Sequence, residues 1–322
     1  MKGNRYTLAF NKLLNKLDSI CIQYNKSKGY FLWDAAWAYI CYGVTPNQYI
    51  GFAFYRLSAL ERKQFYTARF QNKYDKRFNP PSITPIFNDK EKTLKTFARY
   101  VQRDWLYTPN ATVEEVSRFL DRHPKVIVKP SNLSSGRGIY VRKNETAEEI
   151  KGSGCLLEEF VCQHHDMSKL NSSSVNTIRI YTLIKKQLSS PSLPPPIWIT
   201  AMVRVGGAGA EVDNYHQGGV GYPIDIETGI ISACGYDING KSYLFHPGTD
   251  TQAIGFQIPN WNKLKEYVNN LCSVVPEARL IAWDIVVLED GFDLIEANVN
   301  GDSGLMQSVS KEGKRRMIMN EL

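Results

Sequence analysis

The sequence predicts an α+β protein in which helices come first and a largely antiparallel sheet follows. Residues 4–27 place apolar side chains at helical spacing, and residues 30–80 are rich in aromatics up to the breaker Asn79-Pro80-Pro81. From Val126 onward the apolar runs shorten and are separated by turn residues, which is typical of strands. Near the C-terminus, residues 283–300 have the pattern of a β-hairpin.

Four helical segments are expected before the strands. They cover residues 4–27, 30–80, 94–106 and 112–122. Thr112 is the N-cap of the last helix, and Glu115 three residues later completes a capping box.

The longest uncharged stretch, residues 35–55, carries Gly43 and Pro46 near its middle. A membrane span does not place such turn residues at its centre. We therefore expect two core helices joined by a turn, and no transmembrane span. Peripheral contact with a membrane stays open.

The strands are expected in the second half of the chain. They cover residues 126–128, 139–142, 156–160, 177–184 and 197–205, followed by a hairpin over 221–236. A helix at 261–274 precedes the hairpin 283–300, and a last helix is expected near 308–317.

Composition and cysteine usage indicate a reducing compartment. The 322 residues are 43% hydrophobic and 22% charged, as in soluble globular proteins. Residues 1–18 are polar and basic without the apolar core of a signal peptide, and the six cysteines show no C-x-x-C spacing. These features argue against a disulfide scaffold and a zinc site, and predict a cytoplasmic location.

The positive charge is concentrated at the N-terminus. Residues 1–80 hold 13 Lys/Arg and 4 Asp/Glu, a net +9, whereas the remainder holds 26 and 28, a net −2. Such a module attracts an acidic glycan, an anionic membrane or nucleic acid, or simply solvates its helix faces. No nucleic acid is expected, because no nucleic-acid motif is visible.

The hairpin 283–300 has a turn of the three-residue type, Glu289-Asp290-Gly291. Glycine is favoured at the last position because it accepts a positive φ. Such a loop places Leu288 opposite Phe292.

The same register places Asp284 opposite Glu296, and strand alternation puts Asn298 on the face of Glu296. Three hard oxygen ligands then converge. They suit Mg²⁺, with substrate phosphates completing its shell. The alternative is an ordinary solvated face.

A strand ending in Lys129 precedes a Ser/Gly loop at 131–138 and a second strand. A lysine at the end of a buried strand can direct its charge at a phosphate, and small residues beyond it let backbone N–H groups approach phosphate oxygens. Neither a Walker A motif nor a Rossmann fingerprint is present. A hairpin loop without a ligand is the alternative.

An apolar strand at 155–161 runs into the polar stretch Gln163-His164-His165-Asp166. Exposed backbone after such a strand is a good edge for an adenine ring, and a later carboxylate can bond the ribose. The two histidines invite a metal site. A surface pair is expected instead, because neighbouring side chains on a strand face opposite ways and no partner lies at ligand spacing.

Arg179 and Arg204 lie within predicted strands, and Asn214 begins a segment that ends in Gly218-Gly219. Buried arginines need anionic partners, because an unpaired buried charge is costly. Those partners are either structural carboxylates or a ligand's phosphate and carboxylate.

Taken in order, these segments resemble the ATP-grasp superfamily, and within it the sugar-transfer-associated ATP-grasp group. The resemblance covers roughly residues 85–318 and rests on order and spacing. The residues that carry it are Lys129 with its Ser/Gly loop, Glu158-Glu159-Phe160-Val161, Thr177-Ile178-Arg179, Arg204, Asn214 with Gly218-Gly219, and Asp284 with Glu296 and Asn298.

The resemblance implies an ATP-grasp fold, in which two α+β subdomains with mainly antiparallel sheets clasp ATP. The expected division is a helical, basic, aromatic-rich region 1–80 and an ATP-grasp domain 81–322, with a nucleotide lid at about 125–165 and a metal-binding subdomain at about 175–318. Many family members begin with a Rossmann-like domain that helps to bind the acceptor. The helical N-terminus departs from that pattern and leaves the acceptor site undefined.

The resemblance also implies residue roles. Lys90 is preferred to Lys92 and Lys95 as the earlier phosphate-binding lysine. The implied catalytic residues are Arg179, Arg204 and Asn214. The implied nucleotide-binding residues are Lys90, Lys129, Ser134, Ser135, Gly136, Gly138, Glu158, Glu159, Phe160, Val161, His165 and Asp166. The implied ligands of one or two Mg²⁺ ions, for which Mn²⁺ could substitute, are Asp284, Glu296 and Asn298.

The implied reaction joins a carboxylate to an amine through an acyl-phosphate, with release of ADP and phosphate. The group's name suggests a sugar or polysaccharide precursor as the carboxylate, as in capsule synthesis, and glycan-assembly enzymes as partners. Phosphoryl transfer needs positioning and charge neutralisation more than a protein nucleophile, which fits these residues. The alternatives are a sugar kinase on the same scaffold and a non-catalytic nucleotide- or glycan-binding module.

Overall fold

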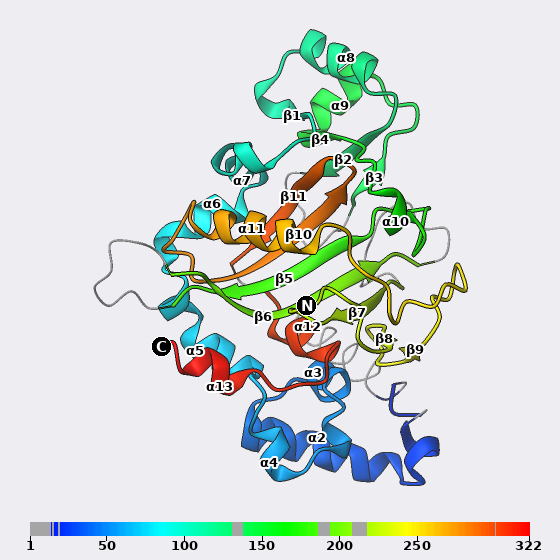
Figure 1. Cartoon of the computed structure of the whole chain (residues 1–322), viewed down its shortest axis with the longest axis vertical. Helices are drawn as coiled ribbons and strands as arrows, with labels where there is room; N and C mark the ends of the chain where they lie inside the picture. Colours follow the sequence, from blue (N-terminus) through cyan, green and yellow to red (C-terminus); the bar gives the residue numbers. More distant parts are fainter. Residues whose placement is uncertain are drawn as a thin grey trace.

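The computed structural model describes residues 14, 16–18, 20–130, 138–185, 194–207, 218–299 and 301–322. Helices gather at one end of the molecule, a seven-stranded sheet forms its centre, and a four-stranded sheet with two helices forms the other end (Figure 1). The expected α+β class is therefore confirmed for the described residues.

The helical region is built from short elements with defined caps. These are α2 (Lys28–Tyr42), α3 (Pro46–Gly51), η1 (Phe54–Arg56), α4 (Ala59–Arg62), α5 (Ala68–Phe78), η2 (Pro81–Ile83), α6 (Thr84–Asn88), α7 (Lys90–Thr96) and η3 (Ala98–Tyr100). Gly43 ends α2 with a φ of 68°, and Thr45 caps α3 through a capping box. The uncharged stretch is thus broken at its glycine. Within the described residues, no helix has the length and apolar character needed to cross a membrane.

The core of this region is aromatic and contains one buried ion pair. Its largest buried side chains include Phe31, Phe52 and Phe54. Asp34 accepts two hydrogen bonds from Arg62, at 2.7 and 2.8 Å, and a third from the Tyr49 hydroxyl at 2.7 Å. The one acidic side chain of α2 is therefore neutralised inside the core.

The four-stranded sheet has the order β1-β4-β2-β3 and is antiparallel throughout. Its strands are β1 (Trp105–Tyr107), β2 (Val126–Pro130), β3 (Tyr140–Val141) and β4 (Cys155–Glu159), and the two helices α8 (Val113–Arg122) and α9 (Ala147–Ser153) supply apolar residues to its core. The predicted capping box of Thr112 and Glu115 is present at the start of α8.

The helix predicted over 94–106 is wrong. Helix α7 ends at Thr96, and Trp105–Tyr107 pairs with β4 as an edge strand. Pairing with a strand some 50 residues away overrides the local helical pattern.

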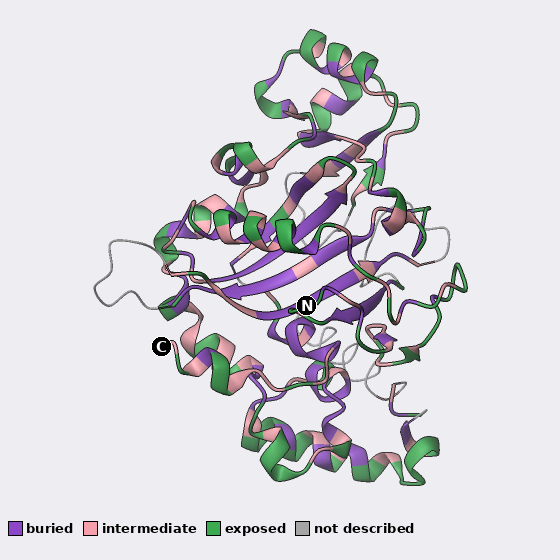
Figure 2. Ribbon diagram, viewed as in Figure 1, coloured by how far each residue is buried: buried purple, intermediate pink, exposed green. Residues whose placement is uncertain are grey.

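The seven-stranded sheet has the order β11-β10-β5-β6-β7-β8-β9. Its strands are β5 (Thr177–Leu183), β6 (Ile197–Val205), β7 (Val220–Ile224), β8 (Gly235–Tyr236), β9 (Ser242–Tyr243), β10 (Leu280–Leu288) and β11 (Gly291–Asn298). Figure 2 shows the central strands as almost entirely buried. Helix α11 (Trp261–Cys272) packs on one face, and α5, α12 (Ser303–Ser308) and α13 (Arg315–Met319) cover part of the other.

The single helix predicted near 308–317 is also wrong, because α12 and α13 are separate. The chain turns between them at Lys311, whose φ is 58°. Gly313 lies so close to Gln64 that a Cβ there would collide with the Gln64 backbone. Packing of this segment against the helical region therefore determines where the chain turns between α12 and α13.

The hairpin of β10 and β11 reaches the predicted pairing by a different route. Its turn is a two-residue loop, so Leu288 lies opposite Gly291 rather than Phe292. A β-bulge adds one residue, Ile295, to β11 and shifts the register by one position. The two differences cancel, and Asp284 lies opposite Glu296 as predicted.

Candidate functional site

A line of charged side chains crosses three neighbouring strands of the large sheet. Glu296 on β11 lies opposite Asp284 on β10, which lies opposite Arg179 on β5. Arg179 Nε donates to Asp284 Oδ1 at 2.7 Å, and Arg179 Nη2 donates to Asp284 Oδ2. This bidentate pair is the strongest common geometry between arginine and a carboxylate.

Arg204 on β6 adds a second positive charge to the same group. Its Nη1 lies 3.5 Å from Asp284 Oδ2, and its Nε donates to the Thr177 hydroxyl at 3.1 Å. Burial alone would raise the pKa of the Asp284 carboxyl, but the two guanidinium groups outweigh burial and lower it. Asp284 is thus held ionised among cations.

The predicted metal ligands are placed unequally. Glu296 is exposed, and Asn298 keeps a buried Nδ2 with no hydrogen-bond partner among the described residues. Asp284 already accepts three hydrogen bonds from the two arginines, whereas an ionised carboxylate has about four acceptor positions. An orphaned buried amide beside two carboxylates fits a site for a bound cation and the oxygen ligands that accompany it.

A second ionic network joins the two sheets. Lys129 at the end of β2 contacts the Glu158 carboxylate on β4. Arg103 donates to Glu158 at 3.1 Å and to Asp293 on β11 at 2.6 Å, and its side chain is only 2% exposed. Burial would raise the pKa of Glu158, but Arg103 and Lys129 lower it to about 2.

Lys90 approaches this network from the start of α7. Its Nζ donates at 3.0 Å to the carbonyl of Pro130, the residue before the predicted phosphate loop. Burial lowers its pKa and nearby Lys129 lowers it further, while Glu296 and Glu158 raise it. Lys92 and Lys95 instead carry exposed side chains paired to carboxylates of their own helix or its N-cap. Lys90 is therefore the lysine that lies near the other predicted residues.

The segment after β4 is only partly available to a ligand. The Glu159 N–H donates to Asp104 O at 2.9 Å, and the Phe160 N–H donates to Lys125 O at 3.1 Å. The Lys125 ammonium also lies 3.5 Å above the Phe160 ring. These contacts occupy the N–H groups of Glu159 and Phe160, and they involve neither backbone group of Val161.

The pair His164 and His165 does not lie on a strand, so the reason given for a surface pair is wrong. The two residues begin α10 (His165–Ser168), and their rings stack with centroids 4.4 Å apart. Both face Glu289 in the β10–β11 turn, and His165 donates its backbone N–H to that carboxylate at 2.6 Å.

These three side chains are close enough together to suggest a metal site. The Asp166 N–H, however, donates to His164 Nδ1 at 3.1 Å. In the neutral ring the proton then sits on Nε2, which faces Glu289 and cannot also bind a metal. The cluster is better described as a hydrogen-bonded clamp between α10 and the hairpin turn.

Four predicted residues, Ser134, Ser135, Gly136 and Asn214, lie outside the described part of the chain. Gly138, which follows the first three, is described and has a φ of 72°. This is a left-handed conformation that glycine adopts at little cost.

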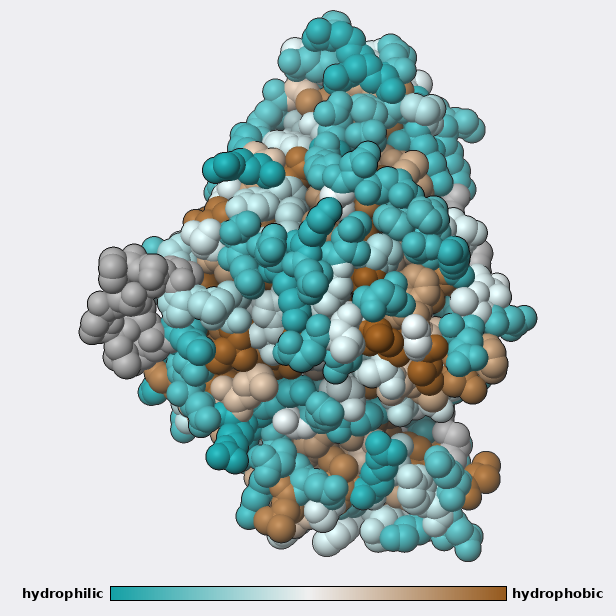
Figure 3. Space-filling model, viewed as in Figure 1, coloured by the Kyte–Doolittle hydropathy of each residue, from teal (hydrophilic) through white to brown (hydrophobic). Residues whose placement is uncertain are grey.

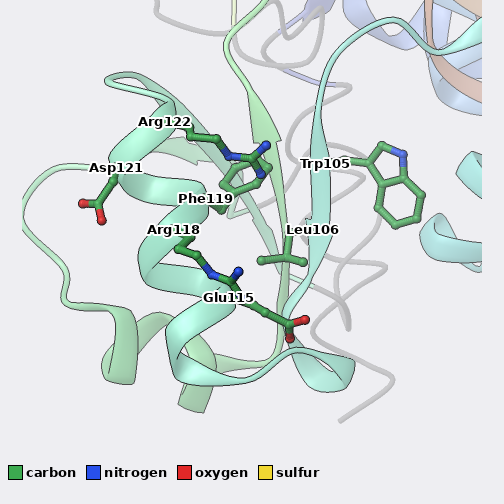
Figure 4. A pocket seen from close by; sticks show the side chains of 7 residues that line it. All are labelled: Trp105, Leu106, Glu115, Arg118, Phe119, Asp121 and Arg122. Carbon is green, nitrogen blue, oxygen red and sulfur yellow. The ribbon is translucent and has the colours of Figure 1, made fainter.

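An open hollow of about 640 Å³ lies elsewhere, between β1 and α8. Figure 4 shows Arg118 and Arg122 extending from α8, with Leu106 pointing toward the helix from β1 and Trp105 pointing away from it. No predicted site residue lines it, and its basic side chains stand beside Glu115 and Asp121. It therefore adds nothing to the site on the large sheet.

The model of the sugar-transfer associated ATP-grasp family matches residues 150–320. This protein belongs to that family. The predicted resemblance and the ATP-grasp fold are thereby confirmed. The matched range contains β4 and the charged hairpin, whereas Lys90 and Lys129 lie before it. No curated protein matches the chain.

Solved ATP-grasp structures are similar at low identity. The ATP-grasp ligase PsnB, complexed with a phosphomimetic variant of its minimal precursor, Mg and ADP, shares 14% identity with a TM-score of 0.42 over 74% of this chain and 60% of PsnB. D-alanine–D-alanine ligase from Bacillus anthracis shares 12% with a TM-score of 0.43, over 78% and 74% of the two chains. N5-carboxyaminoimidazole ribonucleotide synthetase from Thermus thermophilus shares 12% with a TM-score of 0.46, over 79% and 59%. This ATP-grasp chain thus spans about three fifths of PsnB, and its family membership rests on the family model.

Three charged residues of this ATP-grasp chain were missed by sequence reasoning. Arg103 and Asp293 link the two sheets, and Glu289 holds the two histidines. Asp293 could have been noticed, because an acidic residue inside an apolar strand needs a buried partner. Arg103 carried no local signal, since its partners are 55 and 190 residues away.

Proposed function

We propose that this protein is an ATP-dependent carboxylate–amine ligase that works through an acyl-phosphate. The carboxylate is proposed to lie on a sugar or polysaccharide precursor, in keeping with the description of the family, and the second substrate to be an amine or amino acid.

The observation that supports the proposal is that charged residues of the two sheets lie near enough to shift one another's pKa values. The pKa of Lys90 is lowered by Lys129 of the small sheet. It is raised by Glu158 of the small sheet and by Glu296 of the large sheet. The pKa of Asp284 is lowered by Lys129 as well as by Arg179 and Arg204. Cations and hard oxygen ligands therefore face one another where the two sheets meet, as a site for Mg·ATP requires.

Each cation has a proposed task. Lys90 and Lys129 neutralise the nucleotide phosphates, and Glu158 and Arg103 fix the direction of Lys129. Val161 offers its backbone to adenine, and His165 or Asp166 lies at the ribose. When bound, Mg²⁺ would be held by Glu296, Asn298 and the remaining acceptor position of Asp284, and it would draw charge from the phosphates.

The proposed chemistry runs in two steps. A substrate carboxylate oxygen attacks the γ-phosphorus, the bond from that phosphorus to the β–γ bridging oxygen breaks, and ADP leaves. The amine then attacks the acyl carbon, the C–O bond to phosphate breaks, and the amine proton is lost to solvent. Arg179 and Arg204 stabilise the negative charge that builds on the transferred group.

The two arginines also favour a ligase over a kinase. A carboxylate and an acyl-phosphate are both anions, and paired guanidinium groups held on adjacent strands fit them. Transfer to a neutral hydroxyl is helped by a general base near the acceptor. Among the described residues of this face, Asp284 lies between two guanidinium groups that lower the pKa of its carboxyl, which keeps it a weak base.

Trapping the acyl-phosphate tests the proposal directly. The protein is incubated with Mg·ATP, a panel of uronic acids and hydroxylamine, and hydroxamate and ADP are measured. A ligase yields both in equal amounts. A kinase yields ADP and a stable phosphate ester without hydroxamate, and a binding module yields neither.

Matched variants show where the reaction occurs. Glu296→Gln should lower hydroxamate formation by about tenfold or more, because one metal ligand is lost. Glu277 is an exposed residue that precedes the start of β10, and Glu277→Gln should leave hydroxamate formation unchanged. Equal activity of the two variants would contradict the assigned site.

A further inference from the structure

Helix α2 presents an apolar stripe to solvent. Tyr30, Trp33, Trp37 and Ile40 recur at intervals of three and four residues, so they lie on one side of the helix. Their exposed fractions are 43, 65, 49 and 64%. The Trp33 and Trp37 rings are parallel within 2°. A row of large apolar side chains exposed in this way marks an interaction surface.

The side chains of the stripe are not part of the core of the helical region. That core uses the other side of α2, through Phe31 and Ala38. The acidic Asp34 is also buried there, in its pair with Arg62. No acidic side chain of α2 therefore reaches the exposed stripe.

Cations stand at both ends of the stripe. The Lys26 ammonium lies 3.9 Å above the Tyr30 ring at the start of α2. At its end, the exposed Arg69 donates to the carbonyls of Tyr39, Ile40 and Cys41. Residues 1–80 together carry a net charge of +9, in contrast to −2 for the rest of the chain.

The position of α2 in the molecule also suits contact with a flat surface. Helix α2 lies across one end of the longest axis of the molecule, away from the four-stranded sheet at the other end (Figure 1). Figure 3 shows apolar and hydrophilic side chains side by side over this end. A helix in this position can lie in the plane of a surface while the sheets point away from it.

We propose that α2 docks this protein onto the surface of an anionic lipid bilayer. Tyrosine and tryptophan side chains prefer the membrane–water interface, and nearby lysine and arginine side chains are attracted by anionic lipid headgroups. Ile22 and Leu60, exposed at 84% and 74%, extend the apolar surface of the same region. Aliphatic side chains such as Ile22 and Leu60 are stabilised when lipid acyl chains remove their surface from water, whereas a polar glycan surface provides little such stabilisation.

Vesicle co-sedimentation tests this. The full chain is mixed with vesicles of phosphatidylcholine alone or with phosphatidylserine added, at low and high salt. We expect binding to the anionic vesicles that weakens with salt. Replacing Trp33→Ser and Trp37→Ser together should reduce binding by roughly tenfold or more, because two large apolar side chains no longer leave water.

A matched control replaces Leu244→Ser and Phe245→Ser, which are exposed at 46% and 49% outside the helical region. This variant should bind vesicles like the wild type, and both variants should keep the wild-type melting temperature. Quenching of Trp fluorescence by brominated acyl chains should be strong in the wild type and reduced when Trp33 and Trp37 are replaced by Phe.

Three outcomes would overturn the proposal. These are no binding to anionic vesicles, equal loss of binding in both Ser variants, or binding without quenching. A concentration-dependent dimer lost in the Trp33→Ser, Trp37→Ser variant, without vesicle binding, would assign the stripe to a second copy. Fluorescence changes on adding an anionic polysaccharide, again without vesicle binding, would assign it to a glycan.

Discussion

The two ionic networks of this protein use the same components and leave them in different states. In the network between the sheets, Arg103 is buried between Glu158 and Asp293, and Lys129 takes the remaining side of Glu158. Its carboxylates are therefore enclosed by cations. These two carboxylates have little capacity to bind a further cation.

The network on the large sheet is open on one side. Asp284 is paired with Arg179, but its neighbour Glu296 is exposed and Asn298 holds an amide nitrogen without a partner among the described residues. Buried charge alone therefore does not identify a binding site. A binding site is indicated by polar side chains that remain exposed or lack a hydrogen-bond partner, as Glu296 and Asn298 do among the described residues.

The largest expected effect comes from breaking the closed network. Arg103→Met should lower the free energy of unfolding by about 3–5 kcal/mol, because it leaves two buried carboxylates without their shared cation. Denaturant unfolding measures this. The double variant Arg103→Met, Asp293→Asn should recover part of the loss. An unchanged unfolding free energy in the single variant would mean that this network does not stabilise the fold.

Acid should weaken the same network. The folded-state pKa of Glu158 is lowered to about 2, below its usual value. Its contribution to stability is therefore fully present above the usual glutamate range near pH 4.5 and is lost as the pH falls toward 2. Melting temperatures should fall as the pH is lowered below about 4.5, and Glu158→Gln should flatten that dependence. An equally steep fall in the variant would show that other groups are responsible.

Substitutions of Lys90 and Lys92 test whether the nucleotide site beside Asp284 and Glu296 extends to Lys90. Lys90→Met should weaken ATP binding about tenfold, because a cation close to both sheets is lost. Lys92→Met removes the same charge from an exposed position and should change binding little. Similar losses in the two variants would mean that general charge, rather than the position of Lys90, attracts the nucleotide.

The smallest expected effect on stability belongs to the open network. Glu296→Gln should change the free energy of unfolding by no more than about 0.5 kcal/mol, because the side chain is exposed. Thermal unfolding without ligand checks this. A loss as large as that of Arg103→Met would mean that the two networks are not different in kind.

Much of the fold was readable from local patterns. The capping box of Thr112 and Glu115 and the helix break at Gly43 follow from short-range physics and were predicted. The pairing of Asp284 with Glu296 was also predicted, but by two errors that cancel. Ile295 has the appearance of any strand residue, so the bulge that it creates could not be read from the sequence.

The parts that could not be predicted depend on distant contacts. Arg103 lies in a segment with a helical pattern, and its role becomes visible only when β4 and β11 come together. The stacking of His164 on His165 likewise depends on a carboxylate in a turn 124 residues away. Sequence spacing identified Asp284 and Glu296 in the hairpin, and the structure shows that Glu296 remains exposed.

A Mg·ATP site at the β10–β11 hairpin is tested most directly by calorimetry of Mg·ATP binding to the wild type and to Glu296→Gln. We predict that the wild type binds, that the variant binds at least about tenfold more weakly, and that both unfold at the same temperature without ligand. Equal affinity in the two proteins, or no binding by the wild type in the presence of a carboxylate substrate, would contradict the account.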